Sequence, residues 1–262
     1  MSLTSSRPRP FTTITSDRLA VSIFGTSIGM WIVLLVWSES PYSIYLGHSS
    51  LDKVAGPIGL IPLASIFLVG WSAMVLAMML PATFPLVSEL RRRAWGHSGR
   101  SSTMLTVAGA VSLWVPFGIA AYFMDLGVHR AFELPPLEGN VWILGFFSLA
   151  LAGIYQFTPA KSAFLTDCCG LNEFLQSQRP EASPEDRSFR VGLSYGKKSM
   201  GSHWAMTLLM FSLGLQSFPL MLLLGTAMAV EHDLKLGPRM RVPIGCAILA
   251  LALYVGLANV RI

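Results

Sequence analysis

The sequence predicts an all-α membrane protein, a polytopic bundle of about seven transmembrane helices with its N-terminus in the cytoplasm. Hydrophobic residues make up 53% of the chain and charged residues only 13%, whereas ordinary soluble domains carry about 25% charged residues. The apolar residues also gather into runs near the length that a helix needs to cross a bilayer, about 20 residues. The chain is therefore expected to fold within a lipid bilayer.

A polar, basic tail of residues 1–18 precedes a single transmembrane domain over residues 19–262. The first apolar run has no small-residue cleavage site after it, so we expect it to remain as a span. The longest polar stretch, about 159–198, is too short for a soluble domain and is expected to form a cytoplasmic loop. The apolar runs are Leu19–Trp37, Gly59–Met79, Thr103–Met124, Val141–Thr158, Met200–Val230 and Val242–Ala258.

The run Met200–Val230 is too long for one span and short for two. Gly214 and Pro219 lie in its middle and favour a break. Two helices fit if the first begins near Phe189 and the second continues to about Leu236. One broken or tilted span, or a re-entrant pair, remains the alternative.

Lysine and arginine residues favour the seven-span topology. Seven spans place 16 of them on the cytoplasmic side and 3 on the other, against 14 and 5 for six spans, and cytoplasmic loops are rich in these residues. The net charge of +5 is explained by this bias, and nothing indicates nucleic-acid binding. The expected location is the bacterial inner membrane, with the lipid bilayer as the first partner.

Two residue patterns predict how the spans pack. Gly70, Ala73 and Ala77 form a stripe of small residues, which lets helix backbones approach closely in lipid. Pro116 is expected to kink the third span.

The segment "GWSAMVLAMMLPATFP" offers methionine sulfur within a span. Trp71, Met74 and Met78 share one helical face, and thioether sulfur suits Cu(I). Methionine is also an adaptable core residue, so packing is the favoured interpretation of this pattern taken alone.

The segment "GIYQFTPAKSAFLTDCCG" carries a lysine, an aspartate and two adjacent thiols at the end of the fourth span. Adjacent side chains point in different directions, so Cys168 and Cys169 are not expected to chelate one ion together. One thiol with Asp167 could still contribute. The favoured interpretation is a pair of cytosolic loop thiols, with Lys161 extending toward the lipid headgroups. With Cys246 inside an apolar run, the three cysteines form no disulfide framework.

The segment "KKSMGSHWAMTLLMF" places a histidine among methionines. On a helix Met200, His203 and Met210 fall within about 80° of one another, with Met206 near the edge. Imidazole with thioethers suits copper, and a histidine inside a membrane helix usually faces an interior partner. An interfacial histidine just beyond two lysines is an equal alternative.

The triplet Glu231–His232–Asp233 ends an apolar run, and we favour a charged helix end at the water boundary over a metal or proton site. No hydrolase, zinc-protease or phosphate-loop motif is present in the sequence. The protein is therefore expected not to be an enzyme.

Three blocks resemble a bacterial family of integral membrane proteins described as metal-binding and sometimes labelled copper chaperones. The blocks are "WSAMVLAMMLPATFP", "IYQFTPAKSAFLTDCC" and "GLSYGKKSMGSHWAMTLLMF" followed by Glu231, and the resemblance covers roughly 71–241. Where the family usually carries cysteines, this chain has Phe164, Ser199, Ser202 and His203, and only Cys168 of one cysteine pair remains. The resemblance thus implies a family scaffold whose metal site is rebuilt or lost.

These observations lead to three functional hypotheses. The first is a non-enzymatic, copper-handling membrane protein whose ligands are His203 and Cys168, with Met200, Met206, Met74 and Met78 as secondary candidates. Trp71 would then be a packing anchor, Lys161 an interfacial anchor, and Glu231 a helix-end or supporting group. The second is a metal-free accessory subunit of a membrane enzyme complex, and the third is a transporter of metal or another small solute.

Overall fold

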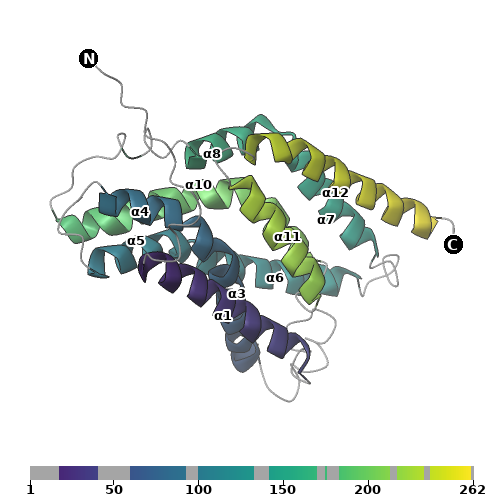
Figure 1. Cartoon of the computed structure of the whole chain (residues 1–262). Coiled ribbons are helices and arrows are strands. Elements are labelled where there is room, and N and C mark those ends of the chain that lie inside the picture. Colours follow the sequence, from purple (N-terminus) through teal and green to yellow (C-terminus); the bar gives the residue numbers. More distant parts are fainter. Residues whose placement is uncertain are drawn as a thin grey trace.

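The computed structural model describes residues 18–40, 60–92, 100–132, 142–169, 175, 183–212, 217–232 and 237–260. Every regular element within these residues is an α-helix (Figure 1), which confirms the all-α prediction. The helices are α1 (Arg18–Ser38), α3 (Leu60–Ala82), α4 (Phe84–Arg92), α5 (Arg100–Ser112), α6 (Trp114–Phe132), α7 (Trp142–Gln156), α8 (Pro159–Cys169), α10 (Pro184–Ser212), α11 (Phe218–Glu231) and α12 (Gly237–Val260).

Four helical segments are long and apolar enough to cross a membrane. They are Arg18–Ser38, Ala64–Ala82, Ser101–Val128 and Arg239–Asn259, and a fifth arises if α7 and the start of α8, bent by 62°, form one broken span. Large apolar side chains such as Ile28, Ile61 and Leu253 are exposed on these helices, as expected of surfaces that face lipid. Seven spans and a cytoplasmic N-terminus stay predictions.

The run Met200–Val230 contains the end of α10 and nearly all of α11, so two helices form there as expected. Neither is among the four candidate spans, and their crossing the membrane stays a prediction. The predicted effect of Pro116 is also visible, because α5 ends at Ser112 and α6 begins at Trp114. A proline ring collides with the carbonyl four residues earlier, which here is that of Ser112. The break therefore lies one turn before the proline.

Residues 159–198, expected to form a cytoplasmic loop, contain α8 and the first half of α10. Ser183 caps α10, since its hydroxyl accepts a hydrogen bond from the Asp186 amide at 3.1 Å and donates to the Asp186 carboxylate at 2.8 Å. This cap, with Pro184 as the first helical residue, is a strong helix start. The cytoplasmic position of the stretch stays a prediction.

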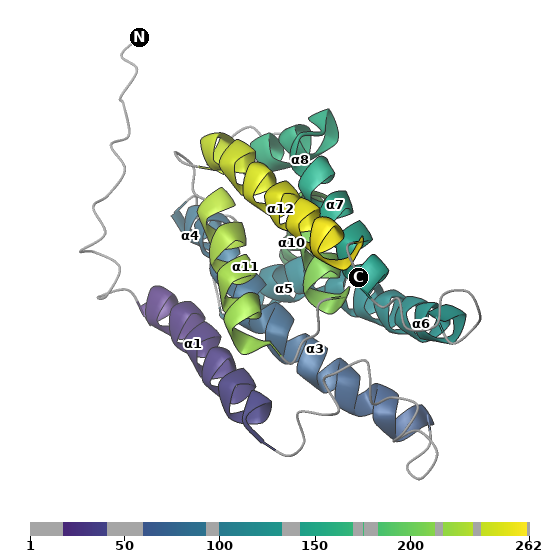
Figure 2. The same ribbon diagram turned by 90° about the vertical axis from the view of Figure 1, so that its right-hand side faces the viewer.

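The long helix α10 runs through the middle of the molecule (Figure 1). It contacts α5, α7, α8 and α11, while α12 packs beside α7 and α1 beside α3. Helix α11 lies between the α1–α3 pair and α12 (Figure 2). The main apolar core forms where α3, α6, α7, α10 and α11 meet.

Glycines bring the backbones of α5 and α10 into direct contact. A Cβ atom at Gly192 would meet the carbonyl oxygen of Thr106, and one at Gly196 would lie 2.5 Å from that of Ala110. On α5, a Cβ atom at Gly109 would likewise collide with the carbonyl oxygen of Phe189. Small residues four apart allow this approach between membrane helices, and they fix α10 against its neighbour.

Trp71 is a packing anchor, as predicted. Its side chain is fully buried, and its indole Nε1 donates a 2.8 Å hydrogen bond to the carbonyl oxygen of Trp114 at the start of α6. The ring stacks between Phe67 and Phe117. Trp71 therefore ties α3 to the break between α5 and α6.

Candidate functional site

Six side chains from four helices meet in the interior, and we call them the buried polar cluster. They are Gln156 at the end of α7, Lys161 on α8, His203 and Met206 on α10, Glu231 at the end of α11, and His232 directly after it. All are fully buried except His232, which is partly buried. The cluster is thus a polar site enclosed by an apolar bundle.

An ion pair forms the centre of the cluster. Lys161 Nζ lies 2.6 Å from Glu231 Oε2, and both side chains are 0% exposed. Helix α8 begins at a Thr158–Pro159 cap, where the Thr158 hydroxyl accepts the Lys161 amide at 3.2 Å, and this start directs the lysine inward. The interpretations of Lys161 as an interfacial anchor and of Glu231 as a charged helix end are therefore wrong: each residue neutralises the other inside the protein.

His203 is held by its own helix on one side and faces the ion pair on the other. Its Nδ1 lies 2.6 Å from the Ser202 hydroxyl and 3.2 Å from the Ser199 carbonyl oxygen. A carbonyl can only accept, so the Ser199 contact favours a proton on Nδ1 and a lone pair on Nε2. Nε2 lies 3.4 Å from Glu231 Oε2 and makes no hydrogen bond with any described residue. The two atoms attract each other only when Nε2 also carries a proton. His203 is completely buried and so is not in contact with water, although its contact with a backbone carbonyl is one that the interfacial interpretation allowed.

His232 stacks on His203. The two ring centroids are 4.6 Å apart and the ring planes differ by 18°. Sequence analysis did not propose His232 as a ligand, since its triplet resembles an ordinary polar helix end. The adjacency of a carboxylate and an imidazole was the available signal, but only the burial of Glu231 shows that it points inward.

Met206 supplies the sulfur of the cluster. Its Sδ accepts a hydrogen bond from Gln156 Nε2 at 3.0 Å and lies 3.7 Å from Lys161 Nζ. Among the predicted sulfur ligands, Met206 is the one that these contacts place beside His203. Met200 and Met78 are partly buried against the apolar core, and Met74 lies within it. Cys168 is in the last turn of α8, but its side chain lies outside the described residues.

Within the part of the chain that the structure describes, several buried atoms of the cluster have no hydrogen-bond partner. They are Gln156 Oε1, His203 Nε2, Glu231 Oε1 and His232 Nε2. Buried polar atoms are normally paired with protein or with a bound water or ion. Four unsatisfied atoms in one cluster indicate that it takes up something besides its own side chains.

The donors fit a soft or borderline metal ion by chemistry. Two imidazole nitrogens and a thioether suit Cu(I). As the side chains stand, however, no three His, Cys, Asp or Glu residues in the described ranges converge on one point. The lone pairs of stacked imidazoles lie in nearly parallel planes, so one ring must rotate before both can bind the same ion. The ligand atoms are therefore close together but not yet oriented toward a common metal position.

Residues 68–255 match the sequence model of the PpoB2 family, described as copper chaperone. This range includes α3 from Leu68 onward, the later helices as far as residue 255 in α12, and the whole buried polar cluster. No curated protein and no solved structure matches the chain. The match covers well over half of the chain, which therefore belongs to this family.

Proposed function

We propose that this chain, a member of the copper chaperone family, is a non-enzymatic multi-pass protein of the bacterial inner membrane that binds copper as cargo in the buried polar cluster. His203, His232 and Met206 would contact the metal, with Glu231 beside them. The observation that carries this proposal is the set of unsatisfied nitrogen and oxygen atoms around the fully buried His203. The family description supports copper as the metal.

The charge of the cluster favours Cu(I) over a divalent ion. Lys161 and Glu231 form a pair whose charges cancel, so any bound cation adds its full charge to a buried site. The cost of desolvating an ion rises with the square of its charge in a continuum medium, and it is large in a protein interior. A monovalent soft ion with neutral nitrogen and sulfur ligands has the lower cost.

The position of the site agrees with the family resemblance. The family usually carries cysteines at the positions of Phe164 on α8 and Ser202 on α10. The Phe164 ring packs on Gly201, so that a Cβ atom there would lie 2.7 Å from it. Phe164 therefore contacts the residue that precedes Ser202 across the α8–α10 contact, and Ser202 itself contacts His203. We propose that imidazole and thioether ligands replace thiolates here, with a weaker affinity, because a thioether carries no negative charge.

Metal content tests this proposal. Detergent-purified wild-type protein, His203→Ala and Met74→Leu are loaded with Cu(I), desalted and analysed by mass spectrometry. We expect about one copper per chain in wild type and in Met74→Leu, whose side chain lies in the apolar core, and loss of most copper in His203→Ala. His203→Cys supplies a thiolate at the same position and is expected to retain copper.

The failing results are equally specific. Wild-type protein that retains no copper refutes the proposed function. Copper that persists in His203→Ala places the metal elsewhere, and loss in Met74→Leu alone would move it to the sulfur atoms of α3. Size-exclusion chromatography and helical circular dichroism of each variant show whether a loss of metal reflects a loss of fold.

The two alternatives make different predictions. An accessory subunit binds no stoichiometric metal and purifies with a stable partner. A transporter needs a polar path across the bilayer and gives ion flux in vesicles. The fully buried ionisable residues within the described ranges are Lys161, His203 and Glu231, and they form one compact cluster rather than a path. This favours binding over transport.

A further inference from the structure

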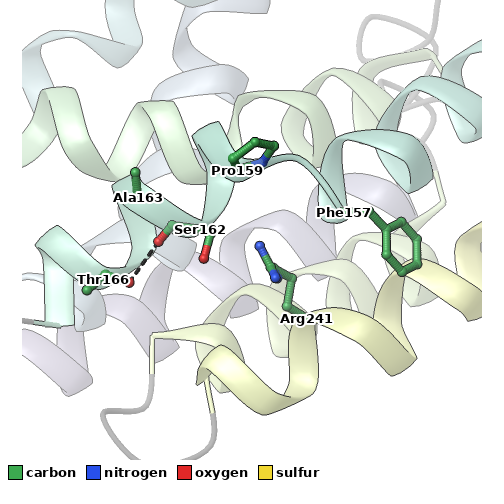
Figure 3. A pocket seen from close by; sticks show the side chains of 6 residues that line it. All are labelled: Phe157, Pro159, Ser162, Ala163, Thr166 and Arg241. Atoms are coloured by element: carbon green, nitrogen blue, oxygen red, sulfur yellow. Dashed lines mark hydrogen bonds between the residues drawn. The ribbon is translucent and has the colours of Figure 1, made fainter.

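An open pocket of about 610 Å³ lies outside the buried polar cluster, where α7 ends and α8 begins. The 62° bend between these helices separates their ends, and the first turns of α12 lie opposite (Figure 3). The residues that line the pocket are Phe157, Pro159, Ser162, Ala163, Thr166 and Arg241. Among the described residues that line it, none is acidic and one is an arginine.

Arg241 points from α12 across the pocket toward Pro159 and Ser162 (Figure 3). Its Nη1 donates one hydrogen bond, of 3.3 Å, to the carbonyl oxygen of Thr158 at the bend. A guanidinium group carries five N–H donors in a rigid planar fork, and the described residues engage one of them. The contact with Thr158 holds the group in place beside the pocket.

The α8 wall adds a hydroxyl donor. The Thr166 hydroxyl donates to the Ser162 carbonyl oxygen at 2.8 Å, whereas the Ser162 hydroxyl has no such partner among the described residues and lies on the pocket side in Figure 3. A planar guanidinium fork beside a hydroxyl is the arrangement that binds phosphate oxygens in a bidentate manner. The first turn of α8 adds a partial positive charge.

The level of the pocket relative to the ends of the spans identifies the source of the phosphate. Arg241 is two residues from the start of the span Arg239–Asn259, and the bend belongs to the broken span of α7 and α8. The ends of spans lie at the level of the lipid headgroups, where basic residues attract anionic lipids. Phe157 is 43% exposed and apolar, and it offers a surface to the upper part of an acyl chain. We propose that this pocket binds the phosphate headgroup of an anionic phospholipid.

Native mass spectrometry of the full chain tests the proposal. Wild-type protein, Arg241→Gln and Arg239→Gln are released from detergent containing equal amounts of phosphatidylglycerol and phosphatidylcholine. Arg239 is exposed and does not line the pocket, so it matches Arg241 in charge but not in position. We expect wild type and Arg239→Gln to retain one phosphatidylglycerol in preference to phosphatidylcholine, and Arg241→Gln to lose that preference by about fivefold or more. Arg241→Lys, which keeps the charge and loses the fork, is expected to retain part of it.

Three results would overturn the proposal. Equal losses in both glutamine variants would show diffuse attraction by surface charge. No lipid preference in wild type would remove the site altogether. Displacement of the lipid by millimolar inorganic phosphate would identify free phosphate as the ligand. The measurement is made on metal-free protein, so it is independent of whether copper binds.

Discussion

Replacing the two members of the Lys161–Glu231 ion pair singly and together tests the centre of the buried polar cluster. Lys161→Met leaves a carboxylate with 0% exposure whose other oxygen has no partner among the described residues. Its nearest polar neighbour is then His203 Nε2, at 3.4 Å, which donates only if the imidazole takes up a proton there. Glu231→Leu leaves an equally buried ammonium group. Removing one partner of a buried ion pair costs about 3–5 kcal/mol, so we expect each variant to lose that much free energy of unfolding.

The double variant Lys161→Met/Glu231→Leu is expected to be far more stable than the sum of the two single losses. Both charges are gone, and apolar side chains of similar size fill the space, a change that is often neutral. The remaining loss is that of hydrogen-bonding partners for the cluster, about 1–3 kcal/mol. The losses of unfolding free energy in the two single variants therefore add up to about 6–10 kcal/mol, whereas the double variant is expected to lose about 3 kcal/mol or less.

Reversible unfolding in mixed micelles, with a copper chelator present, measures these differences. The chelator matters because bound metal would stabilise the wild type and distort the comparison. If the double variant loses as much as both single variants together, the two charges do not interact and the geometry of the cluster is wrong. If Lys161→Met alone costs nothing, Lys161 reaches water and is not buried.

Two further predictions concern the packing that positions the cluster, each read by the same unfolding measurement. Gly192→Ala is expected to lose about 1–3 kcal/mol of unfolding free energy, because its new Cβ atom meets the Thr106 carbonyl and overpacks the contact. The control Gly25→Ala has open space around the new Cβ atom and is expected to be neutral or stabilising. Equal effects of the two variants would contradict the close contact between α5 and α10. Trp71→Phe is expected to lose about 1–3 kcal/mol because the buried indole hydrogen bond to the Trp114 carbonyl disappears, and a neutral result would show that this bond contributes nothing.

Helical elements were predictable where apolar runs or proline signals marked them. Leu19–Trp37 corresponds to α1, and Pro116 correctly indicated the break between α5 and α6. Helix α8 was missed within a polar stretch, although Thr158–Pro159 marks an ordinary helix start. Helix α10 was expected to begin near Phe189, and the Ser183–Pro184 cap places its start at Pro184.

The candidate site was predictable only in part. His203 and Met206 share a helix, so their spacing indicated a common region. Lys161 and Glu231 each lie at the edge of an apolar run, where charged residues usually face water, and nothing local distinguishes them from such residues. Their contact depends on how α8 and α11 pack, which a single sequence does not encode in its periodicity. The small-residue stripe on α3 was likewise visible, while the glycines that join α5 to α10 gained meaning only from the fold.

The sequence separation of the ion pair has a consequence for how the protein is made. Lys161 leaves the ribosome 70 residues before Glu231, which at usual rates of synthesis is about 4–14 s. During that interval the ammonium group has no carboxylate to neutralise it, and burying an unpaired charge inside the protein is costly. The nascent α8 must therefore keep its lysine in contact with water or headgroups until α11 arrives. The interfacial lysine that the sequence suggests is, on this account, the state of an assembly intermediate, and the insertion of α11 is the step that draws it inside.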